Sequence, residues 1–205
     1  MKFFHLSDLH IGLKLMNHDM REDQEYILSE VIEVAGREKP DAIVIAGDIY
    51  DKAVPSAEAV EVFDQFLEKL TEAVPEAVIM MISGNHDSAP RIDCFRKVLS
   101  HQKVYMVGQP PRTEEEYIEK VILEDKDGKV NFYLLPFVKP SMVKQVVGVD
   151  ENGNNLSYNE TLHRLIGREK INSDERNVLV SHQFYLPVGK KADEIERMES
   201  EICTV

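Results

Sequence analysis

Residues 42–51 read AIVIAGDIYD, a run of five apolar residues followed directly by a glycine and an aspartate. A short apolar run that ends in turn-forming residues is typical of a buried β-strand. The same arrangement occurs at residues 3–8, FFHLSD, and at residues 77–86, AVIMMISGNH. The first hundred residues therefore predict three strands, over 3–6, 42–46 and 77–82, each followed by polar residues.

Two helical patterns separate these strands. Apolar residues recur at helical spacing in each pattern, which indicates a helix that buries one face. Pro40 ends the first helix, and Ser56 is a suitable N-cap for the second. The apolar positions are Ile27, Leu28, Val31, Ile32 and Ala35 in the first helix, and Ala59, Val60, Phe63, Phe66, Leu67 and Leu70 in the second. Strands that alternate with helices predict βαβ units, and hence an α/β fold with a parallel sheet.

The remaining sequence predicts a different arrangement. A short helix over 91–100 and a strand over 104–107 precede two strand patterns, over 118–124 and 130–135, that are joined by a turn with Asp127-Gly128. That spacing favours a β-hairpin, and so an antiparallel portion. Residues 136–155 look irregular, residues 159–168 are expected to form a helix, and the strand over 178–180 ends in Ser181-His182.

Composition excludes several classes of protein. The 205 residues are 43% hydrophobic and 30% charged, as in a folded domain rather than a disordered chain. Two cysteines far apart support neither a disulfide framework nor a cysteine-based zinc site. No apolar run approaches the length of a membrane span and no signal peptide is recognised, so we expect a cytoplasmic protein without a membrane partner. The net charge of −13 argues against a protein that coats DNA by itself.

The residues at the ends of the predicted strands have side chains that can bind metal ions or transfer protons. They are Asp8 and His10, then Asp48, then Asn85 and His86, and finally His182. The carboxyl ends of strands in an open α/β sheet converge on a ligand crevice, so these side chains are expected to meet. Carboxylate, amide oxygen and imidazole suit Mn²⁺, Fe²⁺ or Zn²⁺. Two such ions about 3.5 to 4 Å apart can clamp a phosphate and activate a water molecule, and Asp48, central in order, is the natural bridge between them.

These motifs resemble those of the calcineurin-like metallophosphoesterases. The matching stretches are Asp8-Leu9-His10, Gly47-Asp48-Ile49-Tyr50-Asp51, Gly84-Asn85-His86-Asp87 and Ser181-His182. Residues 5–12, HLSDLHIG, and 181–184, SHQF, are similar in particular to the SbcD family of bacterial DNA-repair exonucleases. The resemblance implies a sandwich of two central mixed β-sheets flanked by helices.

The resemblance also implies a role for each residue. Asp8 and His10 would bind one metal ion, Asp48 would bridge, and Asn85 and His182 would bind the second ion. His86 would protonate the leaving oxygen or stabilise charge on the phosphate, which the near-neutral pKa of histidine permits. Asp51 matches the position that orients this histidine, and its carboxylate would favour the imidazolium.

One motif of the family is absent. Its Gly-His-x-His sequence, which completes both metal shells, does not occur in these 205 residues, and His5, His18, His101 and His163 have other settings. We therefore expect residues 1–205 to form one metallophosphoesterase domain that stops before the last ligand motif, without the capping domain and the ATPase-binding segment of the family.

The expected function is a Mn²⁺-dependent phosphodiesterase that acts on DNA in double-strand-break repair and hairpin processing. Mg²⁺, Fe²⁺ and Zn²⁺ are alternative ions. The resemblance implies an SMC-like ATPase partner, which would provide much of the DNA binding. It also implies a homodimer, to whose interface Leu13, Leu15, Met16 and Met20 could contribute. Two alternatives stay open: a phosphoesterase for small phosphodiesters or phosphoproteins, and a non-catalytic dimerisation module.

Overall fold

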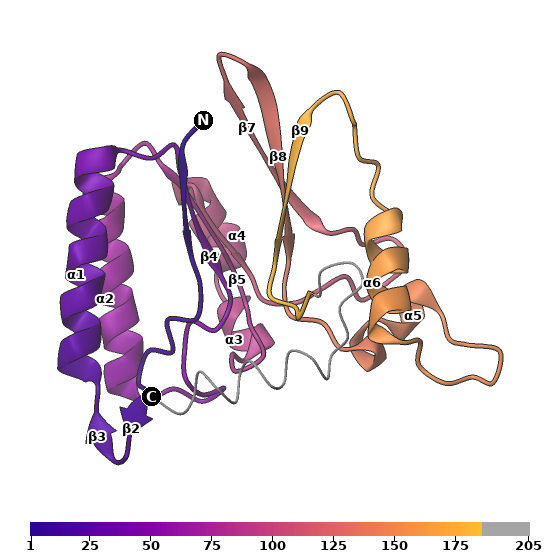
Figure 1. Cartoon of the computed structure of the whole chain (residues 1–205), viewed down its shortest axis with the longest axis horizontal. Coiled ribbons are helices and arrows are strands. Elements are labelled where there is room, and N and C mark those ends of the chain that lie inside the picture. The colour runs from indigo at the N-terminus through magenta and orange to yellow at the C-terminus, as the bar shows by residue number, and fades with distance from the viewer. Residues whose placement is uncertain (186–205) are drawn as a thin grey trace.

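The computed structural model describes residues 1–185 (Figure 1). Two larger β-sheets stand side by side, and a two-stranded hairpin forms a small third sheet. The helices α1 (Arg21–Glu38) and α2 (Ala57–Ala73) lie together on the outer side of the first sheet. Expectations for residues 186–205 fall outside the described residues. No helix within the described part of the chain is both long and apolar enough to cross a membrane. In chain order the elements are β1 (Phe3–Leu6), β2 (Lys14–Leu15), β3 (His18–Asp19), α1 (Arg21–Glu38), β4 (Ala42–Ala46), α2 (Ala57–Ala73), β5 (Val78–Ile82), α3 (Ala89–Ile92), α4 (Arg96–Leu99), η1 (Ser100–Gln102), β6 (Val104–Val107), β7 (Glu119–Asp125), β8 (Gly128–Leu135), η2 (Pro140–Met142), α5 (Lys144–Val147), α6 (Tyr158–Gly167) and β9 (Arg176–Ser181).

The first sheet is parallel throughout, in the order β1-β4-β5-β6, as the alternation of strands and helices predicts. Its central strand β4 is buried at every position, which explains the uninterrupted apolar sequence. Alternate residues of β4 pack into two different hydrophobic cores. Ile43 and Ile45 pack toward α1 and α2, whereas Val44 packs toward the second sheet. The Ser56 hydroxyl accepts a hydrogen bond from the Ala59 N–H, which confirms the predicted N-cap of α2.

The second sheet has the order β7-β8-β9. Strands β7 and β8 form the predicted antiparallel hairpin, and Gly128, the first residue of β8 after the turn, has a φ of 102°. The third strand, β9, runs parallel to β8, so the second sheet is mixed, as the resemblance implies. The physical reason is the crossover formed by η2, α5 and α6, which returns the chain to the end of the sheet where β8 begins. The mixed sheet, together with the parallel one, confirms the α/β fold class.

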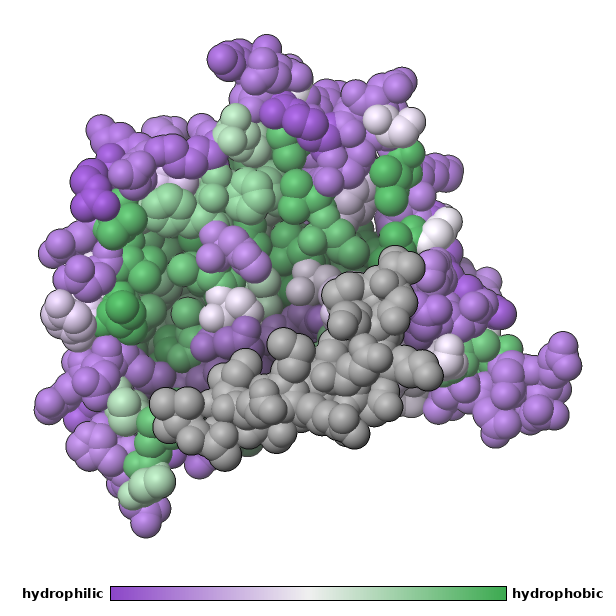
Figure 2. All heavy atoms as spheres, viewed as in Figure 1, coloured by the Kyte–Doolittle hydropathy of each residue, from purple (hydrophilic) through white to green (hydrophobic). Residues whose placement is uncertain are grey.

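A shared apolar core joins the two sheets. Val44, Met80 and Phe132 are fully buried within it, and the ring of Phe3 stands edge-on to that of Phe132 at 5.4 Å. Figure 2 shows that apolar side chains also gather on the surface between α1 and the second sheet, where β1 forms the edge of its own sheet. Phe3 is 41% exposed at this edge. The sandwich is therefore closed in its middle and more open along β1.

The helix predicted over 91–100 is wrong as a single element. The structure has three short helices in this region instead, α3, α4 and η1. Phe95 has a φ of 62°, a left-handed conformation that interrupts a right-handed helix. The Asp93 carboxylate contacts the Arg96 side chain and accepts a hydrogen bond from the Gly108 N–H, and these contacts hold the break in place. Residues 136–155, expected to be irregular, contain the single turns η2 and α5.

Candidate metal centre

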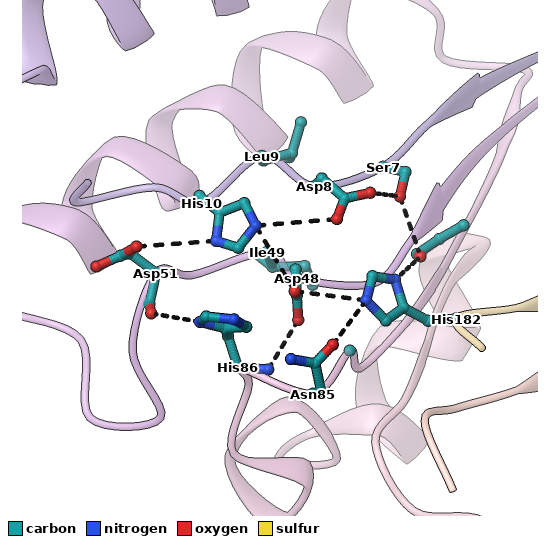
Figure 3. Close-up of polar contacts among 12 residues, drawn as sticks. Ser7, Asp8, Leu9, His10, Asp48, Ile49, Asp51, Asn85, His86 and His182 are labelled. Atoms are coloured by element: carbon teal, nitrogen blue, oxygen red, sulfur yellow. Dashed lines mark hydrogen bonds and ion pairs between the residues drawn. The ribbon is translucent and has the colours of Figure 1, made fainter. Parts of the chain in front are cut away.

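The turns that follow β1, β4, β5 and β9 meet at one end of the two sheets (Figure 3). All seven side chains singled out in the sequence lie in this cluster. They are Asp8, His10, Asp48, Asp51, Asn85, His86 and His182. Strand ends that are far apart in the sequence thus supply a single site, as expected for the carboxyl ends of strands in an α/β fold.

Asp48 occupies the middle of the cluster and is 2% exposed. Its Oδ2 lies 3.6 Å from His10 Nε2 and 3.4 Å from His182 Nε2. Its other oxygen, Oδ1, accepts a 2.8 Å hydrogen bond from the His86 main-chain N–H. The carboxylate is therefore fixed between two imidazoles, one from each sheet.

Two groups of ligand-type atoms share this carboxylate. The first contains His10, Asp48 and His86, and the second contains Asp8, Asp48 and His182, with the atoms of each group within 4.8 Å of one another. These groups place Asp8 with His182, whereas the family pattern implies Asp8 with His10. The two groups adjoin, since His10 Nε2 is also only 3.8 Å from Asp8 Oδ1. The assignment of each residue to an ion stays a prediction.

The loops that carry the acidic residues have an uncommon backbone conformation. Asp8, His10 and Asp48 have φ values of 55°, 43° and 48°, which non-glycine residues rarely adopt and which cluster at functional sites. Main-chain hydrogen bonds hold the two loops together, from Asp8 N–H to the Gly47 carbonyl at 3.1 Å and from His10 N–H to the Asp48 carbonyl at 3.0 Å. The conformation turns the side chains after β1 and β4 toward each other.

Two glycines allow the close approach of the cluster residues. A Cβ at Gly47 would lie 2.4 Å from His182 Nδ1, and a Cβ at Gly84 would lie 2.1 Å from Asp48 Oδ1. Gly47 also has a φ of 97°. Any larger residue at either position would push a candidate ligand out of place.

His182 links the second sheet to the cluster. Its Nδ1 donates a 2.8 Å hydrogen bond to the Ala46 carbonyl, which leaves Nε2 facing the Asn85 Oδ1 at 3.2 Å and the Asp48 carboxylate. The adjacent Asp48 raises the pKa of His182 to about 9. Burial alone would raise the pKa of Asp48, but hydrogen bonds from His182 and from the His86 N–H outweigh it and lower that pKa.

Asp51 contacts both of the other imidazoles, through different atoms. Its main-chain carbonyl accepts a 3.1 Å hydrogen bond from His86 Nδ1, while its carboxylate Oδ1 lies 3.8 Å from His10 Nδ1. The family pattern implies that the Asp51 carboxylate orients His86. In this structure the main chain of Asp51 makes that contact instead, and it fixes the His86 proton on Nδ1.

Sequence reasoning missed two residues that hold these loops. The buried Asp87 carboxylate accepts hydrogen bonds from the main-chain N–H groups of Ile49, Tyr50 and Gly84, and so ties the β4 turn to the β5 turn. Its place beside Asn85-His86 was a signal that could have identified it.

Gln24 of α1 is the second missed residue. Its amide donates to the carbonyls of Leu9 and His10, at 3.2 and 2.8 Å, and its Oε1 accepts a hydrogen bond from the Gly12 N–H at 3.0 Å. Nothing in the local sequence distinguishes Gln24 from any other polar residue of α1. Its role depends on where α1 packs against the β1 loop.

The cluster fits divalent cations. Asp48, Asn85 and His182 direct an oxygen, an oxygen and a nitrogen toward one another, and the buried His10 Nδ1 has no hydrogen-bond partner among the described residues. Mixed oxygen and imidazole donors without thiolate are the set that Mn²⁺, Fe²⁺ and Zn²⁺ share. His18, His101 and His163 lie in β3, η1 and α6, and none of them belongs to the two ligand groups found among residues 1–185.

Comparisons with known proteins agree with this geometry. The family model for calcineurin-like phosphoesterase matches residues 1–194. The D subunit of the nuclease SbcCD from Staphylococcus epidermidis is 32% identical over 195 residues, which is 94% of this chain and 49% of that protein. The protein of the same name from Staphylococcus saprophyticus is 31% identical over 186 residues, 89% of this chain and 46% of that protein. The chain thus spans about half the length of these curated relatives, and it belongs to the calcineurin-like phosphoesterase family.

Proposed function

We propose that this chain carries the catalytic centre of a Mn²⁺-dependent DNA nuclease of the SbcD type. One observation carries the proposal: the buried Asp48 is shared by two groups of ligand-type atoms. A carboxylate in that position can hold two cations at once, which is the arrangement that phosphodiester hydrolysis by two metal ions requires. The similarity to nuclease subunits favours DNA as the substrate.

Each candidate ligand has a role in this proposal. Asp8 and His10 would hold one ion, Asn85 and His182 the other, and Asp48 both. When bound, the two ions would neutralise charge on the phosphodiester and lower the pKa of a water molecule. The chain itself sets the positions of these ligands, through the Gly47 and Gly84 contacts and the hydrogen bonds of Gln24 and Asp87.

His86 is proposed as the proton donor. Its Nδ1–H donates to the Asp51 carbonyl, which holds the ring in one orientation. A ring nitrogen of His86 lies within 4.8 Å of ligand atoms of His10 and Asp48, so a phosphodiester held there is within reach. An imidazolium at this position can deliver its Nε2 proton to the departing oxygen. The main-chain carbonyl of Asp51 holds His86 in position for this role. The Asp51 carboxylate supports the position of His10.

The proposal also covers the cellular role, the protein partner and the oligomeric state. We propose a cytoplasmic protein that acts in double-strand-break repair and hairpin processing, with an SbcC-like SMC-family ATPase as partner, because the net charge of −13 leaves DNA binding to another subunit. A homodimer is also proposed. Of the residues considered for its interface, Leu15 is 53% exposed and Met16 is fully exposed on the β2–β3 hairpin. Light scattering of the purified chain tests this, with Leu15→Glu expected to shift a dimer to a monomer.

Anomalous X-ray scattering at the manganese edge tests the metal centre. Crystals soaked in Mn²⁺ should show two peaks per chain, on either side of Asp48. Asp48→Asn should lose at least one of them, whereas the control Asp64→Asn, an exposed residue of α2, should keep both. A single peak, or none, in the unaltered chain would contradict the two-ion centre.

A substrate panel tests the reaction. Linear DNA, cyclic nucleotides, a phosphopeptide and an aryl phosphate are offered with Mn²⁺, and DNA should be hydrolysed best. His86→Ala should lower the rate about 10²- to 10⁴-fold while both manganese peaks remain, as expected for loss of a proton donor. Preference for a cyclic nucleotide or a phosphopeptide would favour the alternative phosphoesterase. Two bound ions without hydrolysis of any substrate would favour the non-catalytic module.

A further inference from the structure

A hydroxyl group beside the candidate metal centre has no role in the proposed function. Ser7 directly follows β1 and precedes Asp8, and its side chain points toward the Asp8 carboxylate (Figure 3). The Ser7 Oγ donates a hydrogen bond to Asp8 Oδ2 and lies 3.4 Å from the Ala46 carbonyl oxygen. Ser7 is therefore in direct contact with a candidate ligand, although it is not itself one of the candidate ligands.

Asp8 is the most exposed carboxylate of the centre. Its side chain is 57% exposed, whereas that of Asp48 is 3% exposed. Asp48 also accepts a hydrogen bond from the His86 main-chain N–H, but within residues 1–185 the Asp8 carboxylate has only the hydrogen bond from Ser7. An exposed carboxylate that can rotate must lose conformational freedom when it binds an ion. A hydrogen bond that fixes the carboxylate beforehand lowers this cost, and ligating carboxylates are accordingly hydrogen-bonded in turn.

The contact with Ser7 gives the two oxygens of Asp8 different tasks. Oδ1 lies 3.8 Å from His10 Nε2 and so faces the centre, whereas Oδ2 accepts the hydrogen bond from Ser7. A serine hydroxyl has only one proton to donate. The Ala46 carbonyl already accepts a 2.8 Å hydrogen bond from His182 Nδ1, so it does not need the Ser7 proton, which is available to Asp8. Ser7 thereby holds Oδ2 and leaves Oδ1 for an ion.

Ser181 provides a comparison at the end of the other sheet. Ser7 and Ser181 each directly precede a candidate ligand, and both line a cavity of about 380 Å³ that opens beside the centre. The Ser181 hydroxyl, however, makes a 2.9 Å hydrogen bond with the Tyr185 hydroxyl, and it has no hydrogen bond with a candidate ligand within the described residues. Since Ser7 lines an open cavity, there is also room for one more methyl group at that position. The two serines thus share a cavity but differ in their hydrogen-bond partner.

We propose that Ser7 is a positioning residue of the metal centre, whose hydroxyl fixes the Asp8 carboxylate so that Oδ1 faces the ion position shared with Asp48. The inference rests on the proposed function, since it concerns the same centre. Ser7 contacts neither the substrate nor an ion in this role, because it acts only through Asp8. Loss of the hydroxyl therefore weakens the binding of the ion that Asp8 holds, without changing the reaction once that ion is bound.

Titration calorimetry of the whole chain with Mn²⁺ tests this role. Ser7→Ala should lower the affinity for one of the two ions about 10- to 100-fold, the usual effect of losing a group that orients a ligand. Ser7→Thr should keep the affinity of the unaltered chain, because the hydroxyl remains. Ser181→Ala is the matched control and should bind both ions with unchanged affinity. In DNA hydrolysis, the Mn²⁺ concentration that gives half the maximal rate should rise by the same factor in Ser7→Ala, while the rate at saturating Mn²⁺ returns to that of the unaltered chain.

Three calorimetric results overturn the role of Ser7: unchanged Mn²⁺ affinity in Ser7→Ala, an equal loss of affinity in Ser7→Thr, or an equal loss in Ser181→Ala. Thermal melting without Mn²⁺ separates positioning from folding. Metal-free Ser7→Ala should melt at the temperature of the unaltered chain, and a marked decrease would also overturn the role, because Ser7 would then support the fold rather than the ligand. The proposed function fails on a separate measurement, the absence of DNA hydrolysis or of two bound ions in the unaltered chain, whereas the role of Ser7 fails in the comparison among the serine variants.

Discussion

The parallel sheet β1-β4-β5-β6 supplies every candidate side chain at the centre except one, whereas the mixed sheet β7-β8-β9 supplies only His182. The difference follows from topology. Three neighbouring parallel strands end at the same edge, so their turns converge without further help. The second sheet reaches that edge only because the crossover through α6 makes β9 parallel to β8. The parallel sheet therefore builds the centre, and the mixed sheet completes it.

The largest expected effect separates these two contributions directly. His10→Ala removes a ligand of the first sheet and His182→Ala removes the ligand of the second. Each variant should bind one Mn²⁺ in place of two, because Asp48 and the remaining group still surround one ion. Equilibrium dialysis with Mn²⁺ gives the count. His163→Ala, a histidine of α6, is the control and should bind two ions. Loss of both ions in either variant would show that the two groups do not fill independently.

The next effect concerns the support of the first sheet's loop. Gln24→Leu removes the hydrogen bonds to the Leu9 and His10 carbonyls and to the Gly12 N–H while keeping the volume of the side chain. Mn²⁺ affinity should fall about 10- to 100-fold, the usual effect of losing a group that orients a ligand loop. Isothermal titration measures it. Gln65→Leu on α2, where Gln65 contacts the exposed Glu61 side chain, should leave the affinity unchanged. An unaltered affinity in Gln24→Leu would mean that the β1 loop holds itself in place.

The same contrast describes what the sequence could predict. In the first half, apolar runs that end in Ser-Asp or Gly-Asp marked the strand bounds of β1 and β4 without error, and strand order placed Asp48 in the middle of the cluster. The pattern of apolar residues and the turn-forming residues after each strand are local signals, and they are strong for buried parallel strands. This is why the side chains of the centre could be named before their geometry was known.

Features that depend on packing could not be predicted in this way. Gln24 acts through a contact between α1 and a loop, and the Asp51 main chain, rather than its carboxylate, contacts His86. The break at Phe95 arises from a left-handed residue that has no glycine or proline signal. The direction of β9 also depends on a crossover of short helices, each with weak local patterns.

A smaller effect tests how the two sheets meet at Gly47. Gly47 and Gly128 have nearly the same φ, 97° and 102°, but a Cβ at Gly47 would strike His182, whereas nothing in the described part of the chain lies within 4 Å of one at Gly128. Gly128→Ala should cost about 1 to 2 kcal/mol of unfolding free energy from backbone strain alone. Gly47→Ala should cost about 1 to 3 kcal/mol more, because His182 must move. Urea denaturation of the two variants gives the difference. Equal losses would show that His182 yields without cost, and that the second sheet is not held rigidly against the first.

The smallest effect concerns the opposite end of the sandwich, where Asp125 of β7 ties the sheets together. Its carboxylate accepts hydrogen bonds from the Met1 amino group at 2.6 Å and from the Arg176 guanidinium at 3.0 Å. Arg176 first, and then the amino terminus, lowers the pKa of Asp125 well below its usual range. A lowered pKa contributes stability that is fully present above the unfolded-state pKa, near 3.9, and that is lost as the pH falls through the folded-state value.

Asp125→Asn should therefore lower the melting temperature slightly at pH 7, and the difference from the unaltered chain should shrink as the pH falls below about 4. Asp127→Asn, in the adjoining turn, is the control and should have no such pH dependence, because the Asp127 carboxylate makes no hydrogen bond or ion pair within residues 1–185. If the loss in Asp125→Asn is the same at pH 3 and pH 7, the contact contributes through side-chain shape rather than charge. The ends of the two sheets would then be held by the Phe3–Phe132 packing of the shared core rather than by this ion pair.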